Sequence, residues 1–183
     1  GPFEGATVRV DPSGIIAVST GACSQGQGHE TIFAQVAADA FNVPIEDVIV
    51  TVSDTAAIPM GYGTIASRSA VTSSNAIVAS SEKVKTKALA IAANMLEANE
   101  ADLEFRDGGV GVKGVPDMKV TLKQLARAAR PGWDHRRPPG VEAGLEATDY
   151  YEPPTVTWTY AANAAIVEVE TDTGRVRIEK YVS

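Results

Sequence analysis

Short runs in which apolar and polar residues alternate recur along the chain, a pattern typical of strands that bury one face. Three pairs of such runs flank turns rich in Gly, Asp or Thr, and each pair predicts a β-hairpin. The pairs are residues 6–10 with 15–19, 102–106 with 110–113, and 161–170 with 175–182. Residues 48–52 are rich in β-branched residues and predict one further strand.

Three other segments carry apolar residues at helical spacing. Residues 32–41 predict a helix that ends before Asn42 and Pro44. Residues 67–97 predict a long helix buried along one stripe. Residues 121–129 predict a short helix, with Thr121 as its N-cap.

Hairpins separated by helices indicate an α+β fold, in which β-hairpins and a mixed sheet pack with one long and two or three shorter helices.

Two segments show no regular spacing of apolar residues. Residues 54–63 carry Pro and Gly and predict a loop, and the proline-rich residues 131–154 predict a longer one. A loop of that length packs on another surface, closes over a site or is disordered.

Composition restricts the classes of function that need weighing. The chain has 183 residues, of which 44% are hydrophobic and 21% charged, a balance typical of a globular domain with a real core. Its net charge of -7 gives no basic face for nucleic acid. No apolar run is long enough to span a membrane, and no signal-peptide pattern is present. The single cysteine, Cys23, fits a reducing compartment.

The two ends of the chain predict a piece of a larger protein. The chain begins Gly1-Pro2-Phe3 without a methionine and stops at Ser183, directly after a strand-like run. We therefore expect residues 1–183 to form part of a domain in a longer polypeptide, with residues 1–100 and 101–183 as two portions of it.

A glycine-rich stretch, Ser24-Gln25-Gly26-Gln27-Gly28-His29-Glu30-Thr31, lies between a predicted strand and a predicted helix. Glycine permits unusual backbone angles and close approach of another group. Free N–H groups at a helix start favour a phosphate or another anion, and the Gln27 amide can both donate and accept hydrogen bonds. Spacing alone favours a plain capping turn over a binding site.

A second glycine-rich stretch, residues 61–69, precedes the predicted long helix. Thr64, Ser67 and Ser69 place three hydroxyls beside the free N–H groups there, which suits a phosphate, although Ser and Thr are also ordinary N-caps. Two such turns, each opening a helix, favour one shared anionic ligand. Neither turn is a P-loop, because the lysine of that motif is missing.

The order of these motifs resembles the xanthine dehydrogenase and aldehyde oxidase superfamily. The residues that carry the resemblance are Gln-Gly-Gln-Gly-His-Glu-Thr at 25–31, Pro-Ile-Glu-Asp-Val at 44–48, Gly-x-Gly-Thr-x-x-Ser-Arg-Ser at 61–69, and the closing strand pair around 165–174. The pattern is most similar to the molybdenum-binding large subunit of the carbon monoxide dehydrogenase branch.

That resemblance implies a cofactor and partners. The family consists of molybdenum hydroxylases, which oxidise a substrate C–H bond or carbon monoxide and pass electrons to iron–sulfur and flavin domains or subunits. It implies a molybdopterin, in this branch a cytosine dinucleotide, and a cytoplasmic enzyme. The cofactor-binding residues carried over by the motifs are Gln25, Gly26, Gln27, Gly28, Gly63, Thr64, Ser67, Arg68 and Ser69.

The resemblance also implies that the catalytic residues lie elsewhere. The family's glutamate base falls in a Gly-x-Gly-Glu-like stretch beyond Ser183, so we assign no catalytic residue and no metal ligand here. Glu30 is interpreted as a helix-start residue and Glu168 as a strand residue. Ala161 and Asn163 depart from the family's Gly-x-His pattern before the last strand pair. The alternative is a non-catalytic binding or scaffold protein that keeps the fold.

Three further features have plain interpretations. His29 lacks the second histidine of a zinc metalloprotease helix and is expected in the first helical turn, near the cofactor. Cys23 is expected to be a small buried residue rather than a reactive thiol. The local basic cluster is either a solvated face or, in our preferred interpretation, an interface beside Trp133. Its members are Arg127, Arg130, His135, Arg136 and Arg137.

Overall fold

The computed structural model describes residues 3–132, 137–156, 158 and 160–183. The chain begins with a hairpin formed by β1 (Glu4–Val10) and β2 (Ile16–Thr20). Helix α1 (His29–Phe41) then connects β2 to β3 (Val48–Val52), which runs parallel to β2. Strand β7 (Glu146–Tyr151) adds to the other side of β1, antiparallel to it. The result is a four-stranded mixed sheet in the order β3-β2-β1-β7.

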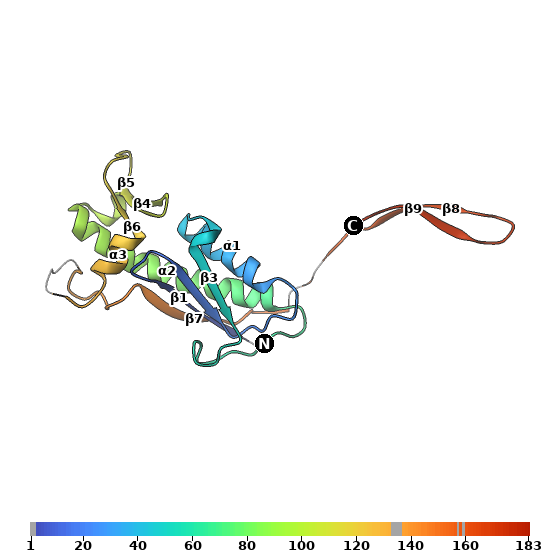
Figure 1. The fold of residues 1–183 in the computed structure, drawn as a ribbon, viewed down its shortest axis with the longest axis horizontal. Helices are drawn as coiled ribbons and strands as arrows, with labels where there is room; N and C mark the ends of the chain where they lie inside the picture. The colour runs from blue at the N-terminus through green and yellow to red at the C-terminus, as the bar shows by residue number, and fades with distance from the viewer. Residues whose placement is uncertain (1–2, 133–136, 157, 159) are drawn as a thin grey trace.

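Two helices cover one face of this sheet (Figure 1). Helix α1 packs on β2 and β3, while α2 (Ser69–Leu96) packs on β1, β7 and α1. The core between helices and sheet is formed by inward strand residues such as Val8 and Val18 and by Phe33 and Phe41 of α1, all fully buried. Burying one such phenylalanine contributes about 2–3 kcal/mol.

A smaller sheet lies against the C-terminal half of α2. Strands β4 (Leu103–Arg106), β5 (Gly109–Val112) and β6 (Lys119–Thr121) form an antiparallel meander, followed by α3 (Leu122–Ala128). The predicted cap of α3 is confirmed, because the Thr121 hydroxyl accepts from the Gln124 backbone N–H in a capping box.

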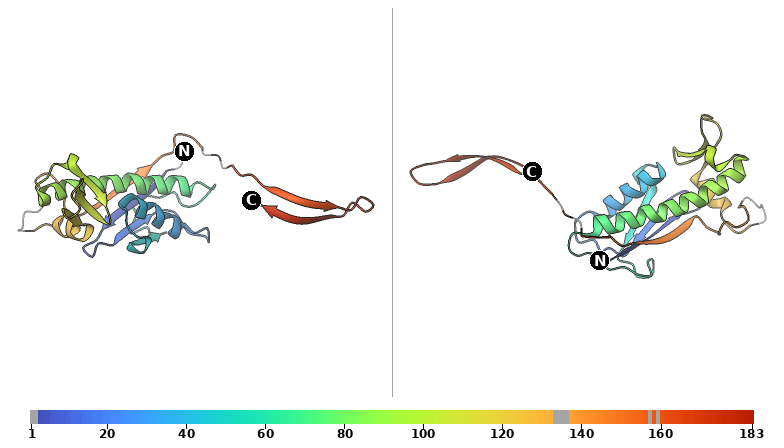
Figure 2. Two further views of the ribbon diagram at one scale, coloured as in Figure 1. Left: turned by 90° about the horizontal axis from the view of Figure 1, so that it is seen from above. Right: turned by 180° about the vertical axis from the view of Figure 1, so that it is seen from behind.

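The third predicted hairpin, β8 (Ala164–Val169) with β9 (Val176–Val182), extends away from the rest of the molecule. All three views show it as a separate arm (Figures 1 and 2). The elements therefore form a body of two sheets and three helices, plus one projecting hairpin.

The α+β prediction is confirmed, with one long helix, two shorter ones, a mixed sheet and hairpins. The prediction that residues 131–154 form one long loop is wrong, because β7 lies within it. Residues 146–151 lack a clear apolar alternation, and pairing with β1 supplies the missing stabilisation. The short strand β6 was also missed. Among the described residues, none of the helices is long and apolar enough to cross a membrane.

Candidate functional site

The two glycine-rich turns meet because the strands before them end at the same edge of the sheet. Strands β2 and β3 are parallel, and Thr20 lies opposite Val52 at their carboxyl ends. The turn after β2 leads into α1, and the turn after β3 leads into α2. Both helices therefore begin at one edge of the sheet, the position where ligands bind in parallel sheets.

Hydrogen bonds hold the two turns side by side. The Cys23 backbone N–H donates to Thr64 Oγ1 at 2.9 Å, and the Ser53 N–H donates to the Ala22 carbonyl at 3.1 Å. The Ser69 hydroxyl lies 3.3 Å from Thr64 Oγ1. Thr64 thus links the first turn to the start of α2.

The first turn leaves the start of α1 open. Gly26 and Gly28 have φ angles of +98° and +77°, and a Cβ atom added to either would meet nothing within 4 Å. These glycines are required by the backbone conformation, and open space lies above them. Gly28 is the N-cap of α1 and offers no side chain to the free helical N–H groups. The Gln27 Oε1 accepts from the Gln25 N–H at 2.5 Å, so the Gln27 amide N–H groups are left to donate elsewhere.

The second turn reaches the start of α2 through strained backbone. Ala66 and Ser67 have φ angles of +51° and +54°, which cost L-residues about 1–2 kcal/mol each. Gly63 has φ +87°, with open space where a Cβ would project. Strain of this kind persists only where the surroundings determine the conformation, and it is concentrated at ligand-binding sites.

A pocket of about 440 Å³ lies between the two turns. It is lined by Gln25, Gln27, His29, Ile32, Thr64, Ile65, Ala66, Ser67, Ser69 and Ala70. Amide, hydroxyl and imidazole groups surround it, and no acidic side chain lines it. Two helix N-termini also add partial positive charge. The pocket therefore suits an anionic group that accepts several hydrogen bonds.

Glu4 holds the second turn in place through hydrogen bonds, a role that the sequence did not predict. Its carboxylate is fully buried and accepts from the Gly5 and Gly63 N–H groups at 3.2 and 3.1 Å. It also pairs with Arg68 at 3.5 Å. The backbones of Gly21 and Gly61 cross against it so closely that a Cβ on either would lie within 3 Å of Glu4 Oε1.

The alternation of β1 contains the signal that could have identified Glu4. Glu4 shares the inward face of β1 with Ala6, Val8 and Val10. A carboxylate at such a position requires a partner, because burying an unpaired charge is costly.

Arg68 was predicted to contact the cofactor, and the structure directs its side chain into the protein. Its guanidinium donates to the Gly63 and Phe3 carbonyls at 2.7 and 3.1 Å and lies over the Tyr62 ring. Arg68 is absent from the residues that line the pocket. With Glu4 it fixes the shape of the turn.

His29 is the first residue of α1, as predicted, and its ring lines the pocket while remaining 96% buried against Phe33. Its Nδ1 atom is enclosed and has no hydrogen-bond partner within the described chain.

The Glu30 carboxylate accepts hydrogen bonds from its own backbone N–H and from the Ser24 hydroxyl. These bonds, with a smaller effect from His29, lower the pKa of Glu30. In the described part of the chain, no cluster of three or more His, Cys, Asp or Glu side chains could hold a metal ion.

The prediction that Cys23 is buried is wrong, since its side chain is exposed beside the second turn. In the basic cluster, Arg127 donates to the Pro12 carbonyl at 3.2 Å, and Arg137 donates to the Val141 carbonyl. The remaining predicted neighbours Trp133, His135 and Arg136 lie outside the described residues.

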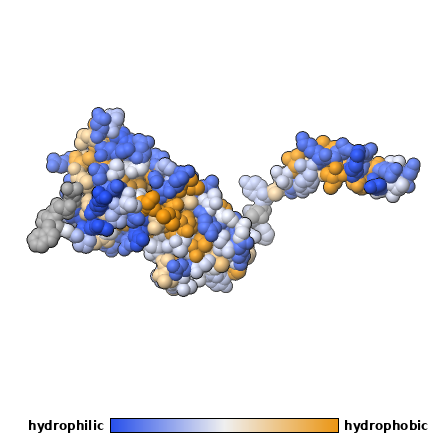
Figure 3. All heavy atoms as spheres, viewed as in Figure 1, coloured by the Kyte–Doolittle hydropathy of each residue, from blue (hydrophilic) through white to orange (hydrophobic). Residues whose placement is uncertain are grey.

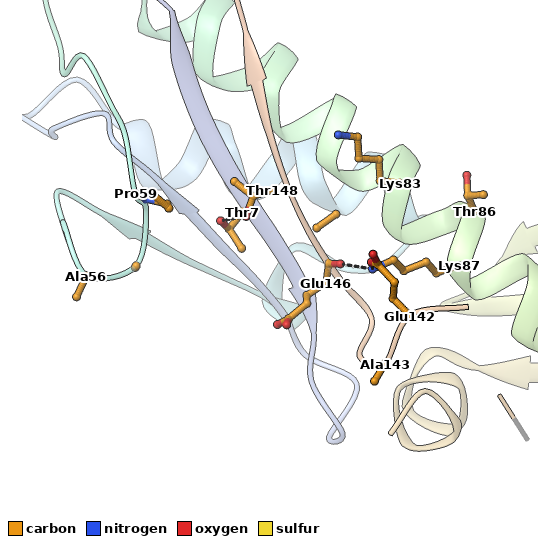
Figure 4. A pocket seen from close by; sticks show the side chains of 12 residues that line it. Thr7, Ala56, Pro59, Lys83, Thr86, Lys87, Glu142, Ala143, Glu146 and Thr148 are labelled. Carbon is orange, nitrogen blue, oxygen red and sulfur yellow. Dashed lines mark hydrogen bonds and ion pairs between the residues drawn. The ribbon is translucent and has the colours of Figure 1, made fainter. Parts of the chain in front are cut away.

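The larger pocket of about 840 Å³ lies elsewhere, between α2, β7 and the loop after β3. Figure 4 shows Lys83, Thr86 and Lys87 of α2 at this pocket, with Thr7 and Thr148 on the neighbouring strands. Both lysines are already paired, Lys83 with Asp149 at 2.9 Å and Lys87 with Glu142 at 2.7 Å. Without free positive charge or a helix start, this pocket lacks the anion-binding features of the smaller one.

The smaller pocket fits the phosphate and pterin portions of a molybdopterin on three structural grounds. Positive-φ glycines next to its lining residues leave open space beside it, the buried His29 Nδ1 in its lining has no hydrogen-bond partner within the described chain, and no carboxylate lines it. A pterin ring carries several acceptors and donors, which the Gln25 and Gln27 amides can match.

Comparison with known proteins identifies the family of the chain. Residues 1–183 match the model of a molybdopterin cofactor-binding domain. The chain is 38% identical over 179 residues to the carbon monoxide dehydrogenase large chain of Afipia carboxidovorans, and the match covers 98% of this chain and 22% of that one. It is 37% identical to the nicotine 6-hydroxylase large subunit of Paenarthrobacter nicotinovorans, covering 97% and 22%.

A solved structure shows the same fold. Quinoline 2-oxidoreductase from Pseudomonas putida 86 matches with a TM-score of 0.86 and 37% identity, covering 98% of this chain and 23% of that chain. The chain thus spans about a fifth of the length of its curated relatives. By its full-length match to this family model, the chain belongs to the molybdopterin cofactor-binding domain family of the large subunits of xanthine dehydrogenase-type molybdenum enzymes.

Proposed function

We propose that the chain is the cofactor-holding part of a molybdenum hydroxylase large subunit. The observation that carries this proposal is the convergence of two helix N-termini and three hydroxyls on one pocket free of acidic side chains. The names of these relatives refer to carbon monoxide, nicotine and quinoline, so the proposed substrate is carbon monoxide or an N-heterocycle. The family resemblance adds an aldehyde to this proposal.

The residues divide the binding between the two turns. Gln25, Gly26, Gln27 and Gly28 hold the pterin portion, with backbone N–H groups and the free Gln27 amide. Gly63, Thr64, Ser67 and Ser69 hold the phosphate portion, while Arg68 acts through Glu4 to keep the second turn in place. A cytosine dinucleotide form fits two phosphates across two helix starts.

The cofactor supplies the redox centre at which substrate is oxidised with oxygen from water. This chain's residues bind and orient that group, and the catalytic base is contributed from outside residues 1–183. Within residues 1–183, residues 1–100 carry both turns and residues 101–183 supply β7, α3 and the projecting hairpin. The intact enzyme passes electrons to iron–sulfur and flavin partners and is cytoplasmic in this proposal.

The test measures molybdenum and pterin per polypeptide in the purified full-length protein. Gln27→Ala and Ser67→Ala each remove a donor to an anionic ligand, and loss of one such bond, about 1.5–3 kcal/mol, lowers cofactor affinity roughly 10- to 150-fold. Gln35→Ala on the exposed face of α1 and Ser74→Ala on α2 are the matched controls.

We expect both control variants to keep the wild-type cofactor content, and Gln27→Ala and Ser67→Ala to lose most of it on dialysis. Unchanged cofactor content in both Gln27→Ala and Ser67→Ala would refute the assigned roles. A full-length wild-type protein that contains neither molybdenum nor pterin would instead favour a non-catalytic scaffold.

A further inference from the structure

The projecting hairpin has one apolar face, which nothing in the described structure covers. Strand register places the two sets of side chains on opposite faces. One face carries Ala165, Val167, Val169, Val176, Ile178 and Tyr181. The five larger residues of this set are between 46% and 64% exposed.

The opposite face is mixed, because its charged residues Glu168, Arg177 and Lys180 stand beside Ala164, Ile166 and Val182. Of these, Ile166 and Val182 are 63% and 53% exposed. Arg177 bonds both Glu168 and Glu179, at 2.5 and 2.8 Å, and Lys180 lies opposite Ile166. A register shift between Ile166 and Val167 leaves Glu179 as an extra residue. This bulge keeps Tyr181 on the same face as Ile178, so the apolar face is continuous. Figure 3 shows hydrophobic and hydrophilic residues together on this arm.

Such a hairpin does not hold its shape alone. An isolated two-stranded ribbon is at best marginally stable in water, and its exposed apolar face and unpaired edges favour association. The hydrogen bonds and ion pairs recorded for residues 164–183 of the described chain all lie within the hairpin or its turn. The body therefore provides no cover for the apolar face.

The matches to longer relatives indicate which protein surface covers the apolar face of the hairpin. The hairpin is about a tenth of the 183 residues, so matches that cover 98% of the chain must include most of it. The relatives keep this segment inside single polypeptides of which this chain covers only 22–23%. An apolar ribbon retained within a longer chain has most of that chain available to bury it.

We propose that the apolar face of β8–β9 docks on an apolar surface of the same large-subunit polypeptide, outside residues 1–183. The opposite face carries Glu168, Arg177 and Lys180, whose burial would be costly, so the wholly apolar face is the favoured docking face. The inference rests on the proposed function only in taking the chain as one part of a longer large subunit. The hairpin joins two parts of that subunit across the linker after β7.

The experiment uses the full-length large subunit with a photo-crosslinking residue at one of two neighbouring positions. Tyr181→benzoylphenylalanine places the probe on the apolar face, and Lys180→benzoylphenylalanine places it on the opposite face as the matched control. Mass spectrometry of the digested product identifies the partner residues. We expect the Tyr181 probe to join residues outside 1–183 of the same polypeptide, at least tenfold more often than the Lys180 probe.

Crosslinks from the Tyr181 probe to a second copy of the chain or to another subunit, or no crosslink at all, would each overturn the proposal. So would equal yields from both positions. Amide hydrogen exchange of the unsubstituted protein gives an independent readout, in which strong protection of residues 176–182 is expected and rapid exchange contradicts docking. Molybdenum and pterin content is measured on the same wild-type sample, so failure of the proposed function is seen separately from failure of docking.

Discussion

Glu4 is the clearest case of one residue that determines the shape of the site without lining it. Its buried carboxylate accepts from the Gly63 N–H and pairs with the Arg68 guanidinium. It also lies against the point where the Gly21 and Gly61 backbones approach each other. The pair is enclosed, with side-chain exposures of 1% for Glu4 and 11% for Arg68. Breaking one partner of such a pair leaves the other charge without compensation.

Glu4→Gln should therefore destabilise the protein by about 3 kcal/mol and lower cofactor retention. The amide keeps the size of the side chain and removes the charge that Arg68 faces. Denaturant unfolding gives the free energy, and metal analysis gives the occupancy. Glu46→Gln, at an exposed position, should change neither. Wild-type stability in Glu4→Gln would contradict the anchoring role.

Gly28→Ala separates backbone strain from ligand contact. Gly28 and Gly114 have similar φ angles, +77° and +75°, and a Cβ on either meets nothing within 4 Å. Alanine at each should cost about 1–2 kcal/mol of unfolding free energy through strain alone. Only Gly28→Ala should reduce molybdenum and pterin content, because its Cβ would project into the open space beside the pocket residues Gln27 and His29. Equal cofactor content in the two variants would show that Gly28 does not face the ligand.

At the scale of elements, β7 completes the sheet from a segment distant in the sequence. It pairs with β1 over six residues and lies against α2, the helix whose N-terminus opens on the pocket. The Lys83–Asp149 ion pair, at 2.9 Å, joins β7 to α2 directly. Lys83 is 55% exposed at its side chain, so solvent screens this pair.

Asp149→Asn should cost no more than about 0.5 kcal/mol near neutral pH. The hydrogen bond from Lys83 is the main cause that lowers the pKa of Asp149 below its ordinary 3.8. The stabilisation is therefore present above pH 3.8 and is lost as the pH falls through the lower folded-state pKa.

Unfolding free energies of wild type and Asp149→Asn should thus converge in acid. Asp117→Asn, at an exposed position, serves as the control. A difference that persists or grows as the pH falls below the folded-state pKa of Asp149 would contradict the assignment of this effect to the Lys83 pair.

At the scale of the whole molecule, the body and the projecting hairpin are independent in their contacts. The body depends on segments that are far apart in the sequence, since β1 near the N-terminus lies between β2 and β7. The hairpin makes its recorded bonds within itself. Removing the hairpin and removing β7 should therefore have different consequences.

A chain ending at residue 160 should keep the unfolding midpoint of the body, whereas a chain ending at residue 144 should lose cooperative unfolding. The second truncation removes β7 and uncovers the edge of β1 and the β7-facing side of α2. Circular dichroism against denaturant measures both. A lowered midpoint in the first truncation would show that the hairpin supports the body after all.

The local sequence determined the helices, the three hairpins and the two glycine turns, because apolar period, caps and turn residues act over a few positions. The family resemblance, which depended on motif order, identified the ligand. Tertiary structure alone decided that β7 pairs with β1, that Cys23 is exposed, and that Arg68 turns inward to Glu4. Those outcomes depend on which distant segment supplies a partner, since a strand edge or a buried charge is stabilised only by contacts that the folded chain brings to it.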